Sequence, residues 1–385
     1  MAANNIMKKL LKLEGALQKD RGSPFDNVLR TTSPSVNFTF GKTHGLPRGM
    51  SLVMYGKPKG GKSLIANMLA GELHKSDPEA IVIKFDTEFR SAGQLDGVGA
   101  LNLGIDPDRL VVYEVNKPSE VFDRIENDIA AIAQENPGKI GLVIIDSING
   151  IQGLRASAAE TLEDDQKQIG DLARTIQTGL KRILPVQRKH NFSVALVAQA
   201  RAEMNPLEIK RGNDVKMGAS FGVQHYAEYF MLVEENRNKD GRSGLMGNAY
   251  ENGEVKDMMG KAEKTGHKIR ATMIHSSMGP KGRTGEFSID YNRGIVDINE
   301  EVFSLALVRG VITRSGVMYS FGDKSWRGKG EAAKALAEDP SIQEAIVKEL
   351  IRRDMSGEML APQTVDGESV IGGEDADVLS TEVED

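Results

Sequence analysis

Apolar runs alternate with segments of helical spacing over the first half of the chain. Five runs have the length and mainly hydrophobic composition of parallel strands buried on both faces, at residues 52–55, 81–85, 110–115, 140–145 and 194–198. Apolar positions at helical spacing separate them, at residues 63–74, 119–134 and 168–189. Pro185 could break the last of these helices. The alternation predicts an α/β fold with a mostly parallel sheet flanked by helices.

Further segments flank this core. Residues 6–18 carry apolar side chains on one helical face, which predicts an amphipathic N-terminal helix. Residues 21–34 have the Gly, Ser and Pro content of a linker. A small α/β module that ends in a helix at residues 341–353 follows the core. The predicted parts are residues 1–34, helix and linker; 35–299, core; 300–354, C-terminal module; and 355–385, a disordered acidic tail.

The charge is divided unevenly along the chain. The net charge is −6, from 49 basic and 55 acidic residues. Nine of the acidic residues and no basic residue lie in residues 355–385, which leaves a charge of +3 on the body. The body is therefore mildly basic and the tail strongly acidic, so the overall charge does not exclude a nucleic-acid partner.

The amino-acid composition limits the cellular location and the kinds of chemical site that can be expected of the chain. With 39% hydrophobic residues and no N-terminal apolar run long enough for a signal sequence or membrane span, we expect a soluble, cytoplasmic protein. The absence of cysteine excludes disulfides and thiolate chemistry. The six histidines show no metal-ligand spacing, so we predict no structural zinc.

The clearest chemical signal is a glycine-rich string that fits the pattern GxxxxGK[ST]. Its residues are Gly56, Lys57, Pro58, Lys59, Gly60, Gly61, Lys62 and Ser63, with Leu64 next in the predicted helix. Glycines let backbone N–H groups surround phosphate oxygens, Lys62 can reach the outer phosphates, and the Ser63 hydroxyl can ligate Mg²⁺. A simple glycine-rich turn is the alternative, but the strand before and the helix after favour a phosphate-binding loop.

Three polar residues follow predicted strands at the carboxyl edge of the sheet, where such sheets bind ligands. Asp146 could order Mg²⁺, usually through water, or cap a turn. Glu88 could polarise the water that attacks a γ-phosphate, or be a solvated loop residue. Gln199 could sense the γ-phosphate, or cap its strand.

The order of these motifs resembles the RecA-type recombinases, a family of P-loop ATPases that includes phage recombinases of the UvsX type. The shared order is the phosphate loop, Asp-Thr-Glu at residues 86–88, Ile-Ile-Asp-Ser at residues 144–147, and Gln199. Residues 45–49 and 308–340 also resemble the family, and the likeness extends over residues 10–353. A generic ATPase would not be expected to share residues 308–340. These residues therefore distinguish the recombinase family from other ATPases better than the nucleotide-binding motifs do.

The resemblance implies a RecA-like, ATP- and Mg²⁺-dependent enzyme of DNA recombination and repair. Such an enzyme forms a helical filament on single-stranded DNA, pairs it with homologous double-stranded DNA and exchanges strands. The family roles fall on Lys62 and Ser63 for phosphate and Mg²⁺, Asp146 for the metal, Glu88 as catalytic base and Gln199 as γ-phosphate sensor. Single-strand-binding and mediator proteins are implied partners, in the host cytoplasm if the source is a phage.

Residues 149–167 and 200–222 are long connections without predicted regular structure, and they match the first and second DNA-binding loops of the family. The predicted DNA contacts are Arg155, Arg201, Lys210, Arg211, Lys216 and Gly218. The cations among them could neutralise phosphates, and a solvated surface charge is the alternative for each. Acidic neighbours in the first connection make Arg155 the weaker candidate.

The chain departs from the family in two places. Bacterial RecA has a pair of lysines that reach the nucleotide of the neighbouring protomer, whereas residues 275–277 here are His-Ser-Ser. Lys281 or Arg283 could substitute. Residues 90–104 lack the tyrosine expected to stack on adenine, so the adenine contact stays unassigned. The N-terminal helix is expected to dock on the adjacent protomer, with packing on its own core as the alternative.

Two other functions share part of this pattern. A ring-forming helicase or motor ATPase of the same fold would keep the phosphate loop, Asp146 and Glu88, but not the C-terminal likeness. A regulatory paralogue would bind DNA and ATP without turnover, against which Lys62 and Glu88 argue. The acidic tail could compete with DNA phosphates for the basic loops, as in the bacterial family.

Overall fold

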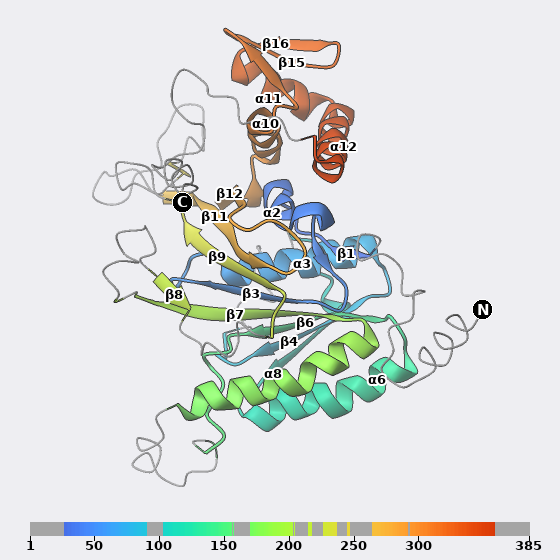
Figure 1. Ribbon diagram of the computed structural model, residues 1–385, viewed down its shortest axis with the longest axis vertical. Helices are drawn as coiled ribbons and strands as arrows, with labels where there is room; N and C mark the ends of the chain where they lie inside the picture. The colour runs from blue at the N-terminus through green and yellow to red at the C-terminus, as the bar shows by residue number, and fades with distance from the viewer. Residues whose placement is uncertain are drawn as a thin grey trace, which may run out of the picture.

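The computed structural model describes residues 27–90, 103–155, 157, 170–202, 204, 215–217, 226–236, 245–246, 264–291 and 293–358. The predicted N-terminal helix and almost all of the acidic tail lie outside these residues. Figure 1 shows a central sheet, helices on both of its faces, and a smaller module beyond one end of the sheet.

The sheet combines a parallel and an antiparallel part. The parallel strands are β3 (Ser51–Gly56), β4 (Ile81–Asp86), β5 (Leu110–Glu114), β6 (Ile140–Asp146), β7 (Ser193–Ala202) and β9 (Tyr229–Glu235). The antiparallel strands are β8 (Val215–Met217), β10 (Leu245–Met246), β11 (Lys264–Ser276), β12 (Thr284–Asp290) and β13 (Gly294–Val296). The order across the sheet is β13-β12-β11-β9-β3-β7-β6-β4-β5, with β8 paired to β7 and β10 to β11.

Helices cover both faces of the parallel part. They are α3 (Lys62–Ser76) on one face, and η4 (Ser119–Ile129), α6 (Ala130–Glu135) and α8 (Asp171–His190) on the other (Figure 1). Alternate residues of each strand enter the two cores: Ile144 packs in the core that includes Leu69 of α3, and Val143 in the core that includes Ile176 of α8. This two-sided burial explains why the runs in the sequence are mainly apolar and do not alternate with polar residues.

The predicted strands and helices of the core are confirmed, with two corrections. Residues 110–115 form a parallel strand, but β5 lies at the sheet edge, and Val111 is 41% exposed rather than buried. The helix does not break at Pro185, because α8 continues through it to His190. Pro185 is exposed, so the carbonyl that loses its N–H donor can be hydrated.

The linker predicted over residues 21–34 is wrong for its described part. The short strand β1 (Val28–Leu29) pairs with β2 (Leu46–Pro47), and Leu29 is buried. Ser33 is buried too and caps α2 (Pro34–Thr39) by accepting the Val36 N–H at 3.2 Å. In the described part of this stretch, the side chains of Thr31 and Ser33 form internal hydrogen bonds.

The second long connection is partly regular, contrary to the prediction for residues 200–222. β7 extends to Ala202 and pairs antiparallel with β8, with Arg201 opposite Lys216. Residues 203, 205–214 and 218–225 lie outside the described part. The first connection is described as far as Arg155 and at Ser157, and residues 149–155 contain turns and irregular backbone but no strand or α-helix.

The C-terminal module has a hydrophobic core of its own. Its elements are α10 (Ile298–Val308), β14 (Thr313–Ser315), β15 (Met318–Phe321), β16 (Lys324–Arg327), α11 (Gly328–Glu338) and α12 (Pro340–Ser356). Tyr319 and Trp326 pack with Phe303 in this core. The predicted closing helix is confirmed as α12, whereas the part boundaries at 34, 299 and 354 stay predictions. None of the helices in the described ranges is long and apolar enough to cross a membrane.

A buried charged cluster joins this module to the sheet. Asp354 of α12 accepts two hydrogen bonds from Arg283, the residue before β12, at 2.6 and 2.8 Å, and lies 2.9 Å from Nε2 of His44. The Arg283 and Arg309 guanidiniums both lie over the Phe38 ring, at 4.7 and 4.4 Å. Burial lowers the pKa of His44 to about 4 although Asp354 opposes the shift, because Arg283 already neutralises that carboxylate.

Candidate functional site

Strand register brings the predicted nucleotide-binding residues to the same edge of the sheet. Gly56, where β3 ends, is opposite Gln199 of β7. Asp86, where β4 ends, is opposite Asp146 of β6. Because these strands are parallel neighbours, their carboxyl ends lie side by side and form a continuous rim. Glu88 lies two residues after Asp86, at the end of this rim formed by β4.

The glycine-rich string forms a tight loop between β3 and α3. Lys59 and Gly61 have left-handed backbone angles, with φ of 62° and 96°. A Cβ at Gly56 would lie 2.0 Å from the Val233 carbonyl oxygen, so this position has room only for glycine. Lys57, Pro58 and Lys59 are exposed at the crest, whereas Gly60 is buried beneath. The loop therefore presents backbone N–H groups at the start of a helix, as phosphate binding requires.

Lys62 folds back over this loop. Its ammonium donates hydrogen bonds to the carbonyl oxygens of Gly56 at 3.0 Å and Lys57 at 2.7 Å. Burial lowers the pKa of Lys62, while the nearby carboxylates of Asp146 and Glu88 oppose that shift. The ammonium thus lies against the glycine-rich loop, close to where the outer phosphates of a nucleotide would bind.

Asp146 lies between a hydroxyl and a buried ammonium. Ser63 donates a hydrogen bond to its carboxylate, and Lys84 Nζ is 3.8 Å from Oδ2. Burial raises the pKa of Asp146, and Lys84 and Ser63 act in the opposite direction. Lys84 is only 4% exposed, so it can compensate the Asp146 charge without reaching solvent.

Glu88 is held by three neighbours. The Ser147 hydroxyl donates to Oε1 at 2.6 Å, and Gln199 Nε2 donates to the same oxygen at 3.2 Å. Arg90 forms an ion pair with Oε2 at 2.8 Å. The carboxylate is thereby fixed at the rim beside Gln199, although its side chain keeps partial access to solvent.

These residues fit a bound Mg²⁺ and nucleotide. The loop glycines pack so closely against Val233 and Ile269 that Gly56 and Gly61 have no room for a Cβ, and the Ser63 hydroxyl and Asp146 carboxylate supply the oxygen ligands that Mg²⁺ prefers. Within the described ranges, no group of three or more His, Asp or Glu side chains could hold a metal. A magnesium ion at Ser63 would therefore also depend on nucleotide oxygens and water.

Comparison with known proteins shows the family of the chain. The family model of the RecA N-terminal domain matches residues 9–237, which is more than half of the chain. The chain belongs to the RecA family. The resemblance and the RecA-like α/β core expected from the motifs are thereby confirmed.

Curated RecA proteins align with most of this RecA-family chain at low identity. The chain is 24% identical to Protein RecA of Aquifex pyrophilus over 323 residues, which covers 83% of this chain and 80% of that protein. It is 24% identical to Protein RecA of Thermus aquaticus over 328 residues, 85% of each chain. It is 25% identical to Protein RecA of Ruminococcus albus over 318 residues, 82% of this chain and 70% of that protein.

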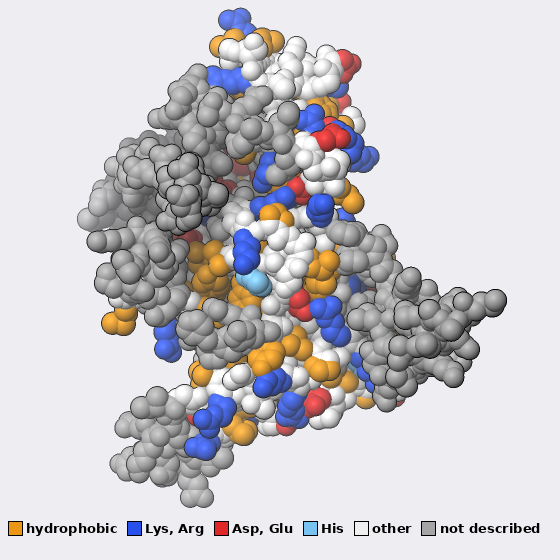
Figure 2. All heavy atoms as spheres, viewed as in Figure 1, with side chains coloured by type: hydrophobic (Ala, Val, Ile, Leu, Met, Phe, Trp, Pro, Cys, Tyr) orange, Lys and Arg blue, Asp and Glu red, His pale blue; other side chains and the backbone are white. Residues whose placement is uncertain are grey.

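The predicted DNA contacts are only partly described. Arg155 is exposed where the first connection leaves the sheet, and Arg201 is exposed two residues after Gln199. Lys216 is paired with Arg201 in backbone register. Lys210, Arg211 and Gly218 lie outside the described residues. On the face drawn in Figure 2, Lys and Arg side chains are dispersed over the core and the C-terminal module.

The contacts of Arg283 within its own chain argue against the role suggested for it at the protomer interface. Its guanidinium is committed to Asp354, to the Phe38 carbonyl oxygen and to the Phe38 ring. Lys281 is exposed and stays a prediction for that role. Residues 90–104, where the family would place an adenine contact, lie mostly outside the described part of the chain.

Sequence reasoning missed three residues of the rim. Lys84 interrupts the apolar run at residues 81–85, and a lysine inside a doubly buried strand was the signal that could have revealed it. Ser147 is the last residue of the Ile-Ile-Asp-Ser motif and Asn149 lies two residues after it, but only the fold shows that Ser147 contacts Glu88 and that Asn149 contacts Gln199.

Proposed function

We propose that this RecA-family chain is a DNA-dependent ATPase that forms helical filaments on single-stranded DNA and catalyses homologous pairing and strand exchange. The observation that carries the proposal is the continuity of β7. The same strand carries Gln199 at the nucleotide rim and Arg201 in the hairpin with β8. A single element thus joins the candidate ATP site to the second candidate DNA loop.

Different residues of the rim bind the phosphates, hold the metal and activate water during ATP hydrolysis. Backbone N–H groups of residues 56–63 cradle the phosphates, and the Lys62 ammonium exchanges its loop carbonyl partners for phosphate oxygens. Mg²⁺ held near Ser63 and Asp146 would neutralise charge that develops on the phosphates. Glu88 orients and deprotonates the attacking water, and Gln199 leaves Glu88 to contact the γ-phosphate.

DNA binding is assigned to the two connections. Arg155 in the first and Arg201, Lys210, Arg211 and Lys216 in the second neutralise phosphates of single-stranded DNA, and Gly218 allows close approach of the backbone. The excess charge of +3 on residues 1–354 is compatible with this partner.

Assembly and partners complete the proposal. The N-terminal helix docks on the adjacent protomer, and residues 355–385 restrain binding of duplex DNA by competing with its phosphates. Single-strand-binding and mediator proteins act on the filament in the cytoplasm, which is that of a host cell if the chain is encoded by a phage.

A strand-exchange assay with ATP, single-stranded DNA and homologous duplex tests the proposal directly. Joint molecules that require ATP and homology, together with helical filaments in electron micrographs, support it. Closed rings that unwind duplex DNA would instead identify a helicase or motor ATPase. ATP binding without DNA-stimulated turnover would identify a regulatory protein.

A further inference from the structure

Asn149 continues the pairing of β6 with β7 after β6 has ended. Beyond Asp146, the Ile148 N–H donates to the Val197 carbonyl oxygen at 2.9 Å. The Gln199 N–H then donates to Asn149 Oδ1 at 2.7 Å. The Asn149 side chain therefore supplies the acceptor that the next residue of a strand would have supplied.

Gln199 is consequently held from several sides at the nucleotide rim. Its backbone is in register with Gly56, the first residue of the phosphate loop. Its side-chain amide donates to Glu88, and its backbone N–H donates to Asn149. A movement of the Gln199 backbone toward a γ-phosphate would therefore strain or shift its bond to Asn149, whereas a rotation of the side chain alone would not.

The segment after Asn149 is braced against the core. A Cβ at Gly150 would lie 2.3 Å from Thr87 Oγ1, so the backbone is in close contact there. Further on, backbone N–H groups donate to other elements: Gln152 to Asn116 O at 2.9 Å, Leu154 to Thr175 Oγ1 at 2.9 Å and Arg155 to Asp171 Oδ2 at 2.8 Å. The described segment from Asn149 to Arg155 is therefore ordered and in contact with the core along its length, so it offers a continuous path from Asn149 to Arg155.

We infer that Asn149 is a positioning residue that holds Gln199 and couples the nucleotide site to the first connection. The inference rests on the proposed function and extends it, since β7 alone links Gln199 only to the second connection. This role requires a side chain at position 149 that has the length of Asn or Asp and an acceptor oxygen at its end, because Oδ1 accepts the hydrogen bond.

The test compares three variants with the wild type. Asn149→Ala removes the acceptor, and Asn149→Asp retains one. Asn136→Ala is the matched control, since it removes an exposed side-chain hydrogen bond, to Ile132 O, at the end of α6. For each protein, ATP turnover is measured with and without single-stranded DNA, and amide hydrogen exchange at Gln199 is measured without nucleotide.

Loss of one hydrogen bond worth about 1 kcal/mol corresponds to about a fivefold change in an equilibrium. We therefore expect about a fivefold fall in the stimulation ratio for Asn149→Ala, faster exchange at Gln199, and recovery of both in Asn149→Asp. A merely structural defect would lower both turnovers together and leave their ratio unchanged. Wild-type stimulation and exchange in Asn149→Ala would overturn the inference while leaving the proposed function intact.

A wild-type protein without DNA stimulation would overturn the proposed function itself. In that case hydrogen exchange still decides the positioning role: unchanged protection of the Gln199 amide in Asn149→Ala refutes it, and lost protection that Asn149→Asp restores supports it.

Discussion

The buried carboxylate of Asp354 is predicted to hold the C-terminal module on the sheet. The substitution Asp354→Asn keeps the side-chain volume but removes the charge that Arg283 and His44 contact. The side chains of Asp354 and Arg283 are only 1% and 10% exposed, so water screens the pair poorly. Removing one partner of such a pair leaves an uncompensated buried charge and costs about 3–5 kcal/mol.

Urea denaturation followed by two signals measures this loss. Trp326 is the only tryptophan of the chain and is packed in the core of the module, so its fluorescence reports on the module. Far-ultraviolet circular dichroism reports on the whole protein. If the module separates from the sheet before the core unfolds, the two transitions will no longer coincide in Asp354→Asn.

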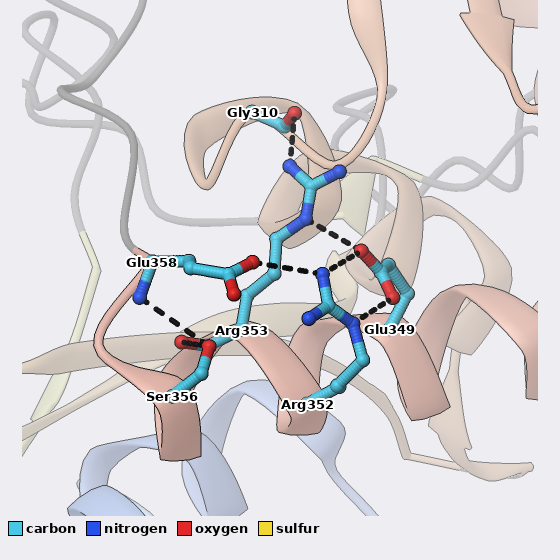
Figure 3. Close-up of polar contacts among 6 residues, drawn as sticks. All are labelled: Gly310, Glu349, Arg352, Arg353, Ser356 and Glu358. Atoms are coloured by element: carbon cyan, nitrogen blue, oxygen red, sulfur yellow. Dashed lines mark hydrogen bonds and ion pairs between the residues drawn. The ribbon is translucent and has the colours of Figure 1, made fainter.

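Glu349→Gln is the matched control on the same helix. Glu349 also accepts hydrogen bonds from two arginines, Arg352 and Arg353, as Figure 3 shows, but these groups are accessible to solvent. Exposed ion pairs contribute little to stability, so its effect should be a small fraction of that of Asp354→Asn. Equal losses in the two variants, or a loss below about 1 kcal/mol in Asp354→Asn, would refute the reasoning.

Three further predictions concern the candidate catalytic base, a buried carboxyl and a candidate DNA contact. Glu88→Gln should retain ATP binding but lower turnover by about 10²–10⁴-fold, and normal single-turnover hydrolysis would remove its assignment as base. Burial raises the pKa of Glu301 to about 7, above its usual 4.5. Its protonated form therefore favours the folded state fully below pH 4.5, and this contribution, about 3 kcal/mol, is lost as the pH rises through 7. Glu301→Gln should lack this loss when urea midpoints at pH 5 and pH 8 are compared, and an identical pH dependence in both proteins would contradict the assignment. Lys216→Ala should weaken single-stranded DNA binding and reduce the slope of log affinity against log salt by about one, whereas an unchanged slope would show that Lys216 contacts no phosphate.

Short-range patterns predicted the parallel core and most of the residues that meet at the candidate nucleotide site. The phosphate loop, Asp146 and Gln199 each follow an apolar run whose burial on both faces is visible in the sequence. Because parallel strands place their carboxyl ends together, the strand ends alone were enough to predict that these residues meet. The same reasoning failed for residues 110–115, since strand order, not composition, makes β5 an edge.

The sequence by itself determined which residues form the phosphate loop and which strands carry polar residues to its rim, because those features depend on neighbours within a few positions. The tertiary structure alone decided the pairing of Asp354 with Arg283, 71 residues apart, and of Ser33 with Glu301, 268 residues apart. It also decided that the described part of the predicted linker, residues 27–34, packs against the core, and that Lys84 lies beside Asp146. Burial makes the difference: a polar side chain removed from water must find a partner, and that partner is chosen by the folded chain rather than by its neighbours in sequence.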